Sequence, residues 1–266
     1  MNSIVCIKLI PDPEAPAASL KIDSTANKVV PSAGVNLVIN PFDEQAVEAA
    51  LRIKDSHGGK VTIISLGMDL PREVVKNPLA MGADDLIILE DPAFEGGDSW
   101  STAYALAMAI KKVGTFDLIF CGRQAGDWDA GQVGSGIAEI LGISSVTVAK
   151  KIEVTDGMAV VERVLPDGYE VIEASLPVLI TISNELGAPR FAAIKGIIAA
   201  SKKQPILWKP VDIDTHPSKI GEAGRLTRLI KLLKPVREGK CELIAGENLA
   251  DAGEKLALRL REAKVI

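Results

Sequence analysis

The residues best placed to do chemistry form a glycine-rich loop, residues 122–136, of sequence GRQAGDWDAGQVGSG. Five of these fifteen residues are glycine, so the backbone can approach a ligand closely. The loop leads into a predicted helix, whose first N–H groups attract an anion such as phosphate. Neither the Gly-Lys-Ser/Thr of a Walker A loop nor a Gly-x-Gly-x-x-Gly fingerprint is present. The loop alone therefore leaves two readings open, a nucleotide site and a glycine-rich turn that ends a strand.

Two further stretches carry polar residues next to apolar runs. In residues 40–44, NPFDE, Asn40 can cap a helix and Pro41 suits its first position, so an ordinary helix start explains them equally well. Lys8 interrupts the first apolar run. It either pairs with a phosphate or carboxylate, or extends its ammonium group to the surface.

Side chains for nucleophilic or metal chemistry are scarce. The two histidines stand in predicted turns, and the three cysteines are far apart and include no Cys-x-x-Cys pair. No Gly-x-Ser-x-Gly elbow occurs. Asp127 and Asp129 are spaced for acid–base or metal work, but capping of their loop explains them better. The residues therefore argue against a disulfide framework, a zinc site and a Ser-His or Cys-His centre.

A second loop, residues 183–191, places Leu186 among polar and turn-forming residues. A leucine at a loop tip is usually an ordinary exposed residue, but it can also anchor a partner protein. The sequence does not choose between these two roles.

The elements that must position these loops alternate between short aliphatic runs and amphipathic stretches. Strands are predicted at residues 4–10, 61–66, 86–89, 118–121 and 146–148, and helices at residues 42–54, 70–79, 99–112 and 132–141. This alternation predicts an α/β fold with a doubly wound, mostly parallel sheet of Rossmann-like type. In such sheets ligands bind at the carboxyl ends of the strands, where the glycine-rich loop lies.

The pattern changes after residue 150. Residues 152–154 and 159–164 flank Asp156-Gly157 and predict an antiparallel hairpin, followed by extended stretches at 169–174 and 176–182. Residues 204–246 are rich in proline and charge and show no periodicity, and an amphipathic helix is predicted at 249–263. We therefore expect a nucleotide-binding domain over residues 1–203 and a C-terminal arm and helix over residues 204–266.

Composition excludes several classes of protein. Thirty basic against 35 acidic residues give a net charge of −5, the wrong sign for nucleic-acid binding. No apolar run reaches the roughly 18 to 20 residues of a membrane span. The first strand begins at once, which leaves no room for a targeting peptide, and the cysteine usage suits a reducing compartment. A cytoplasmic location is therefore expected.

Taken together, these residues resemble the β subunits of electron transfer flavoproteins. The matching stretches follow one another in order over about 200 residues: Val5 to Lys8 with Pro11-Asp12, Asn40 to Glu44 with Ala46 to Glu48, Leu79 to Asp84, Gly122 to Ala125 with Asp127 and Asp129, Gln132 to Gly134, and Leu176-Pro177 with Pro189-Arg190. Pro78 departs from the family pattern and is expected to bend the end of its helix.

The resemblance implies a heterodimer with a larger α subunit, which carries a redox-active FAD and receives the C-terminal arm. It implies that the β subunit passes electrons between a dehydrogenase, or NADH, and an acceptor through flavin. The implied nucleotide pocket is lined by Cys6, Asn40, Pro41, Phe42, Asp43, Leu66, Gly122, Arg123, Gln124, Ala125, Asp127, Asp129, Gln132, Val133 and Gly134. A side chain added at Gly131 or Gly134 is expected to obstruct the ligand.

The resemblance also implies that a flavin dehydrogenase docks on residues 183–191, through Leu186, Pro189 and Arg190. The usual family sequence Leu-Asn-Glu-Pro-Arg-Tyr here reads Leu186-Gly187-Ala188-Pro189-Arg190-Phe191, so the identity of the partner stays open.

The family divides on what the β pocket holds, which is either a structural AMP or a second FAD that takes a hydride from NADH and bifurcates its electrons. Gln132-Val133-Gly134 favours the FAD branch over the Gln-Thr-Gly of the AMP branch. Two other classes compete, a nucleotide-binding sensor without a redox role and a nucleotide-dependent ligase or hydrolase. The hairpin and arm count against the sensor, and the lack of a phosphate-reaching lysine loop counts against the ligase.

Overall fold

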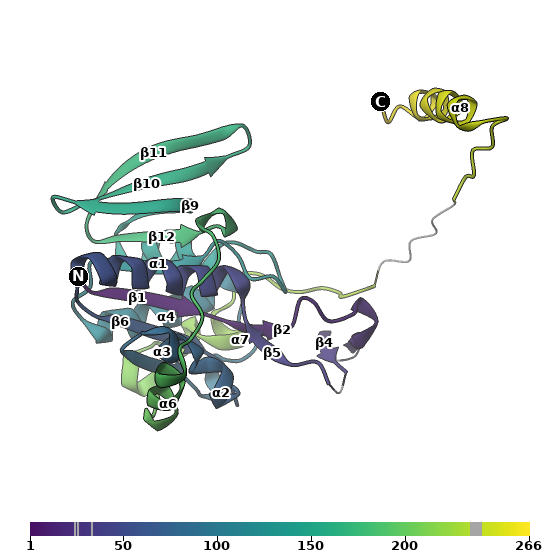
Figure 1. Cartoon of the computed structure of the whole chain (residues 1–266). Coiled ribbons are helices and arrows are strands. Elements are labelled where there is room, and N and C mark those ends of the chain that lie inside the picture. The colour runs from purple at the N-terminus through teal and green to yellow at the C-terminus, as the bar shows by residue number, and fades with distance from the viewer. Residues whose placement is uncertain (24, 26, 33, 235–240) are drawn as a thin grey trace. The chain divides into compact units, whose positions relative to one another are not determined.

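The computed structural model describes residues 1–23, 25, 27–32, 34–234 and 241–266. Within this part of the chain, the first 230 residues form one compact unit and residues 231–266 form a second. The first unit contains a nine-stranded sheet with the strand order β11-β10-β9-β12-β8-β1-β6-β7-β13 (Figure 1).

The seven strands from β9 to β13 in that order run parallel to their neighbours, and the helices between them lie on both faces of the sheet (Figure 1). The predicted doubly wound α/β fold is confirmed. The strands are β1 (Ser3–Ile7), β6 (Val61–Leu66), β7 (Asp85–Leu89), β8 (Leu118–Gly122), β9 (Ser144–Thr155), β12 (Val178–Ile182) and β13 (Ile206–Trp208).

Alternate residues of each strand point to opposite faces, which divides the core in two. Val5 and Phe120 belong to the cluster on the side of α1 (Pro41–His57), α3 (Asn77–Met81) and α6 (Ile194–Lys202). Ile4 and Ile119, one residue earlier in each strand, belong to the cluster on the side of α4 (Ser99–Val113) and α5 (Val133–Leu141).

The chain crosses from one side of β1 to the other between β7 and β8. Strand β1 pairs with β6 on one side and with β8 on the other, so the strand order reverses between β1 and β8. Ligands of open α/β sheets bind in the crevice outside the strand ends at such a point. The topology therefore directs attention to the residues that follow Ile7 and Cys121.

The predicted hairpin is confirmed. Strand β9 pairs with β10 (Met158–Leu165), and β10 pairs with the edge strand β11 (Gly168–Ser175). The turn residues Asp156 and Gly157 have φ angles of 52° and 76°. Positive φ at both central residues is what a two-residue hairpin turn demands and what Asp-Gly supplies.

The helix predicted at residues 70–79 is wrong as a single element. It consists of α2 (Arg72–Val75) and α3, which meet at Lys76. Pro78 cannot continue a helix from α2, because it lacks the N–H that would bond the carbonyl of Val74. At the second position of α3 the missing N–H costs nothing.

The predicted domain boundary at residue 203 falls inside the first compact unit. After it, β13 pairs in parallel with β7, and Ile213 and Ile220 are buried beside α4. Each of these pieces is too short to show a periodicity of its own, so the sequence did not predict that they join the hydrophobic core.

The smaller elements are β2 (Leu9–Pro11), β3 (Leu20–Asp23), β4 (Lys28–Pro31), β5 (Leu37–Ile39), α7 (Gly221–Gly224) and the 3-10 turns Ala17–Ser19, Pro92–Phe94, Asn184–Leu186, Pro210–Ile213 and Pro217–Lys219.

The second unit contains α8 (Leu249–Glu262), which confirms the predicted C-terminal helix. Residues 235–240 of the predicted arm lie outside the described residues. In the part of the chain that the structure describes, no helix combines the length and the apolar character needed to cross a membrane.

Candidate functional site

A cavity of about 650 Å³ lies at the carboxyl ends of β1 and β8, where the strand order reverses. This volume is within the range of about 300–1,000 Å³ that is typical of small-molecule sites. Its lining contains most of the residues that the sequence assigned to the nucleotide pocket: Cys6, Asn40, Asp43, Leu66, Gly122, Arg123, Gln124, Ala125, Gln132, Val133 and Gly134.

Asn40 joins the start of α1 to the glycine-rich loop. It was expected to cap α1, but its side chain makes no capping bond. Instead its Nδ2 donates to the carbonyl oxygen of Gln124 at 2.8 Å, and its Oδ1 accepts the N–H of Gly126 at 3.1 Å. Two stretches that looked like separate candidates in the sequence therefore form one wall of the cavity.

Asp43 ties together the ends of the two strands that flank the reversal. Its Oδ2 accepts the N–H of Lys8 at 2.8 Å and its Oδ1 accepts the N–H of Gly122 at 2.9 Å. Burial raises the pKa of Asp43 to about 7, although hydrogen bonds from Lys8, Asn40 and Gly122 act in the opposite direction. Ionisation of this carboxyl group therefore falls close to neutral pH.

The stability of the chain should report this titration. The pKa of Asp43 is about 7 in the fold against an ordinary 3.8, so between these values the folded state keeps a proton that the unfolded chain has lost. The contribution is full below about pH 4 and is lost as the pH rises through about 7. From pH 5 to pH 8, the free energy of unfolding should fall by about 2.5 kcal/mol more in the parent than in Asp43→Asn. Denaturant titrations of both proteins at the two pH values measure this, and parallel pH profiles would contradict it.

Four of the predicted pocket residues do not line the cavity. Pro41 and Phe42 belong to the first turn of α1, and Asp127 and Asp129 belong to the glycine-rich loop. Asp127 pairs with Lys8, whose Nζ lies 2.6 Å from its Oδ2, and Asp129 accepts from Gln124 at 2.9 Å. Lys8 therefore binds a carboxylate of this chain. Among the described residues, acidic, histidine and cysteine side chains gather in no group of three that could hold a metal.

Arg123 supplies positive charge to the site, as do Lys8, Lys28 and Arg225 elsewhere in the lining. Its Nη1 donates to the hydroxyl oxygen of Ser183 at 3.2 Å, and its guanidinium lies 4.9 Å from the ring centre of Phe42. Its Nε is buried and has no hydrogen-bond partner among the residues that the structure describes. Arg123 also lines the cavity, so its positive charge suits an anionic ligand there.

Two helix N-termini open on the same cavity. Helix α5 follows Gln132, which makes no side-chain cap, so the first N–H groups of that helix are not satisfied by its own cap. Helix α4 presents Ser99, Thr102 and Leu106, which share one face and all line the cavity. Helix α5 has no acidic residue in its first turn, which suits an anion at its N-terminus, whereas the N-terminus of α4 already carries the Asp98 carboxylate, which accepts the N–H groups of Trp100 and Ser101.

The sequence missed the wall formed by residues 225–229. Asp98, the cap of α4, accepts the N–H groups of Leu226 and Thr227 at 2.8 Å each, and the hydroxyl of Thr227 at 3.0 Å. Partial burial raises the pKa of Asp98, but hydrogen bonds from Ser101, Thr227 and Leu226 outweigh it and bring the value to about 2. The further lining residues are Ile7, Lys8, Asn27, Lys28, Gly96, Gly97, Asp98, Ser99, Thr102, Leu106, Cys121, Trp128, Ala130, Gly131, Arg225, Thr227 and Leu229.

Cys6 and Cys121 lie opposite each other on β1 and β8, and both are buried at the base of the cavity. Hydrogen bonding to Cys6 and burial both raise the pKa of Cys121 well above its ordinary value. A thiol that stays protonated is a poor nucleophile, so this pair provides apolar surface for a ligand.

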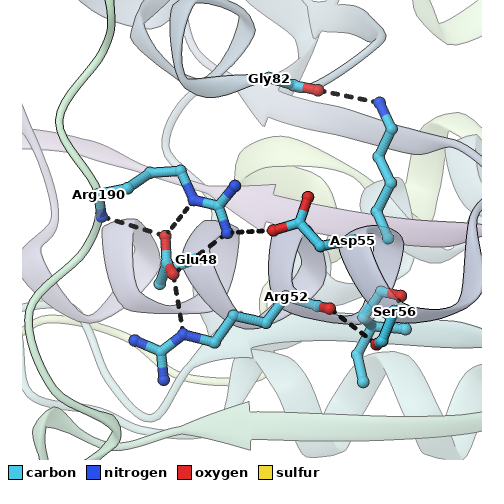
Figure 2. Close-up of polar contacts among 8 residues, drawn as sticks. Glu48, Arg52, Asp55, Ser56, Gly82 and Arg190 are labelled. Atoms are coloured by element: carbon cyan, nitrogen blue, oxygen red, sulfur yellow. Dashed lines mark hydrogen bonds and ion pairs between the residues drawn. The ribbon is translucent and has the colours of Figure 1, made fainter.

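The loop at residues 183–191 differs from its expected form. Leu186 is only 8% exposed and belongs to the hydrophobic core, so the prediction of a leucine displayed at the loop tip is wrong. Phe191 is 98% exposed, and Ile194, at the start of α6, is 77% exposed. Arg190 is engaged within the chain, where its Nε lies 2.8 Å from Glu48 and its Nη2 lies 2.7 Å from Asp55 (Figure 2).

Comparison with known proteins places this geometry in a family context. Residues 28–212 match the family described as electron transfer flavoprotein domain. The chain is 40% identical over 267 residues to electron transfer flavoprotein subunit beta of Thermoanaerobacterium thermosaccharolyticum, and 38% identical over 267 residues to caffeyl-CoA reductase-Etf complex subunit CarD of Acetobacterium woodii. Both alignments cover 100% of each chain. It is 34% identical to acryloyl-CoA reductase electron transfer subunit gamma of Anaerotignum propionicum, over 96% of this chain and 98% of that protein.

Proposed function

Because this chain belongs to the electron transfer flavoprotein family, as a β subunit that passes electrons through flavin, we propose that its cavity holds FAD. The family associates with flavin and its subunits work in complexes with an α partner. A sensor without a redox role is not favoured, since the relatives match the chain over its whole length, hairpin and C-terminal unit included.

The extent of the cavity supports FAD over AMP. FAD consists of an AMP half and a flavin mononucleotide half, so it needs a site that continues well beyond the phosphates. The lining continues from the glycine-rich loop across α4 to Arg225, Thr227 and Leu229. The sequence Gln132-Val133-Gly134, which resembles the FAD branch, points the same way.

Each wall of the cavity has a part to play in holding a dinucleotide. Arg123 and the N-terminus of α5 would bind the pyrophosphate. Cys6, Leu66 and Leu106 provide apolar contacts, and the segment around Thr227, fixed by Asp98, would close the far side against water. FAD, when bound, exchanges one or two electrons or a hydride with its redox partners, and the protein sets where it lies.

The nucleotide content of the heterodimer tests the proposal. The chain is coexpressed with its α subunit, the purified complex is denatured, and released FAD and AMP are quantified by chromatography. We expect two FAD and no AMP per heterodimer. One FAD with one AMP would assign AMP to the cavity, and one FAD alone would show that the cavity holds no nucleotide.

The dehydrogenase would dock on the exposed apolar residues that follow Arg190. Phe191, Ile194, Ile197 and Ile198 are 98%, 77%, 52% and 53% exposed. The three isoleucines, at positions i, i+3 and i+4, share a face of α6. We name these four residues the docking face. We propose this face, in place of Leu186, as the contact for the dehydrogenase. It directly follows the family match at Pro189-Arg190.

The C-terminal unit would bind the α subunit. Leu249 and Leu256, seven residues apart on one face of α8, are 93% and 46% exposed, and an exposed apolar helix face of this kind calls for a partner. We expect Leu256→Asp to weaken heterodimer formation about tenfold, as for a buried interface leucine, and to lower the melting temperature of the complex. Glu254→Gln, on another side of α8, is the control. Equal dimer affinities for the two variants, measured by sedimentation, would contradict the assignment.

The cytoplasmic location stays a prediction.

A further inference from the structure

One face of α1 holds the loop that precedes the docking face. Gln45, Glu48 and Arg52, at positions i, i+3 and i+7, lie on that face. Gln45 Nε2 donates to the carbonyl oxygen of Asn184 at 3.4 Å, and Arg52 Nη1 donates to that of Leu186 at 3.2 Å. Side chains of α1 thus form hydrogen bonds with the main chain of the loop near its beginning and at its middle.

Glu48 binds the same loop at its end. Its Oε2 accepts the main-chain N–H of Arg190 at 3.1 Å and the Nε of that residue at 2.8 Å. Its Oε1 accepts Arg52 Nε at 2.8 Å and Arg190 Nη2 at 3.4 Å (Figure 2). The carboxylate is therefore bonded to a side chain of its own helix and to both side chain and main chain of the loop, 142 residues away in sequence.

The burial of Glu48 shows that these contacts are not ordinary surface pairs. The residue is only 5% exposed, and a buried carboxylate is tolerated when cations and donors surround it. Burial raises the pKa of Glu48, but the hydrogen bonds from Arg190 and Arg52 outweigh it and hold the pKa below its ordinary value. The carboxylate is therefore charged at neutral pH.

This cluster plays no part in lining the nucleotide cavity. Glu48, Arg52 and Arg190 are all absent from the cavity wall. Glu48 and Arg190 nevertheless belong to two of the stretches through which the sequence resembles the family. What the contact does control is the main chain directly before Phe191, which has almost no contact with the rest of the chain.

We propose that Glu48 is a positioning residue for electron transfer: through Arg190 and Arg52 it fixes residues 184–190, so that Phe191 and Ile194 meet a partner flavoprotein in a preformed arrangement. A loop that is already ordered does not lose conformational entropy on docking, and preorganisation raises affinity for that reason. The inference rests on the proposed docking face. It adds that the residues which build the face are distinct from those that touch the partner.

The test separates docking from turnover. Glu48→Gln keeps the shape of the side chain but removes the charge that balances two arginines. The heterodimer carrying it is titrated against an acyl-CoA dehydrogenase that has been reduced with its acyl-CoA substrate. Releasing one or two loop residues costs about tenfold in binding, so we expect the apparent KM for the heterodimer to rise about tenfold, with kcat and FAD content unchanged.

Three further variants make the result specific. Arg190→Lys keeps the charge but cannot donate to both oxygens of Glu48 as the guanidinium does, so it should give a smaller rise in KM. Adding it to Glu48→Gln should add little, because both act through one contact. Asp55→Asn removes only the exposed ion pair of Arg190 and should leave KM unchanged. Hydrogen exchange of residues 184–191 should accelerate in Glu48→Gln and not in Asp55→Asn.

The outcomes distinguish this inference from the proposed function. If Phe191→Ser with Ile194→Ser raises KM while Glu48→Gln does not, the docking face stands and the positioning role of Glu48 is overturned. If neither raises KM, the docking face itself is wrong. A fall in kcat or in FAD content for Glu48→Gln would also overturn the inference, since it would place Glu48 in the flavin site.

Discussion

The heterodimer carrying Thr102→Trp is expected to retain one FAD, whereas the parent is expected to retain two. Thr102 lies on α4 between Ser99 and Leu106, on the face that lines the cavity, so an indole at this position occupies the space of the ligand. Overpacking of a formed site typically costs 1–3 kcal/mol, and at the upper end this weakens nucleotide binding by roughly 100-fold. Chromatography of the nucleotides released by denaturation measures the loss.

Lys111→Trp provides the matched control. Lys111 is exposed on the same helix and does not line the cavity, so the same large residue there should leave both flavins in place. Comparison of the melting curves of the two variants separates loss of ligand from loss of fold. Thr102→Trp with a full complement of nucleotide would show that the ligand binds outside this cavity.

Gly134, which from sequence looked like the residue to enlarge, is unsuited to this test. A Cβ atom at Gly134 would lie 2.7 Å from Cγ2 of Thr181 in β12. Because Gly134 has no side chain, α5 can pack closely on the sheet. This packing alone explains a glycine at position 134, without close approach of a ligand. Gly134→Val would therefore disturb the packing of α5 before it met any nucleotide.

The parts of the site that the sequence revealed are those determined by local physical rules. Apolar runs mark the buried strands, and the parallel order brings residues after Ile7 and Cys121 to one edge of the sheet. The glycine-rich loop and the Asn40 stretch could therefore be assigned to one pocket. Even so, the partners of individual side chains were not predictable: Asp127 and Asp129 do not line the cavity but bind Lys8 and Gln124.

The parts of the site that could not be predicted from the sequence depend on contacts between residues far apart in the chain. Asp98 binds Leu226 and Thr227, which are 128 and 129 residues away. Both lie in the proline-rich segment 204–246, whose lack of periodicity gives no signal that predicts such a contact. The pattern Asp98-x-x-Ser101 does mark the start of α4, and so could have located Ser99 and Thr102. Leu186 looked exposed because its neighbours are polar, whereas a single turn, Asn184–Leu186, directs its side chain into the core.

Replacing Phe191 and Ile194 together by serine should raise the apparent KM for the partner dehydrogenase about 30-fold or more, with kcat and flavin content unchanged. Residues that anchor an interface cost about 2 kcal/mol or more on truncation, which corresponds to that factor. Neither side chain belongs to the described core clusters, so their loss should leave the fold intact. Steady-state reduction of the heterodimer by a reduced acyl-CoA dehydrogenase gives both constants.

Two comparisons decide whether this effect belongs to the docking face. Val211 is 80% exposed elsewhere in the same unit, so Val211→Ser removes an exposed apolar residue without touching the face and should leave KM unchanged. Leu186→Ala should instead lower the free energy of unfolding by about 2–5 kcal/mol, because it empties part of the core. If Leu186→Ala raised KM at full stability while the Phe191 and Ile194 variant did not, the buried leucine would have to leave the core on docking. The partner would then bind a rearranged loop, and the face seen here would be the resting form.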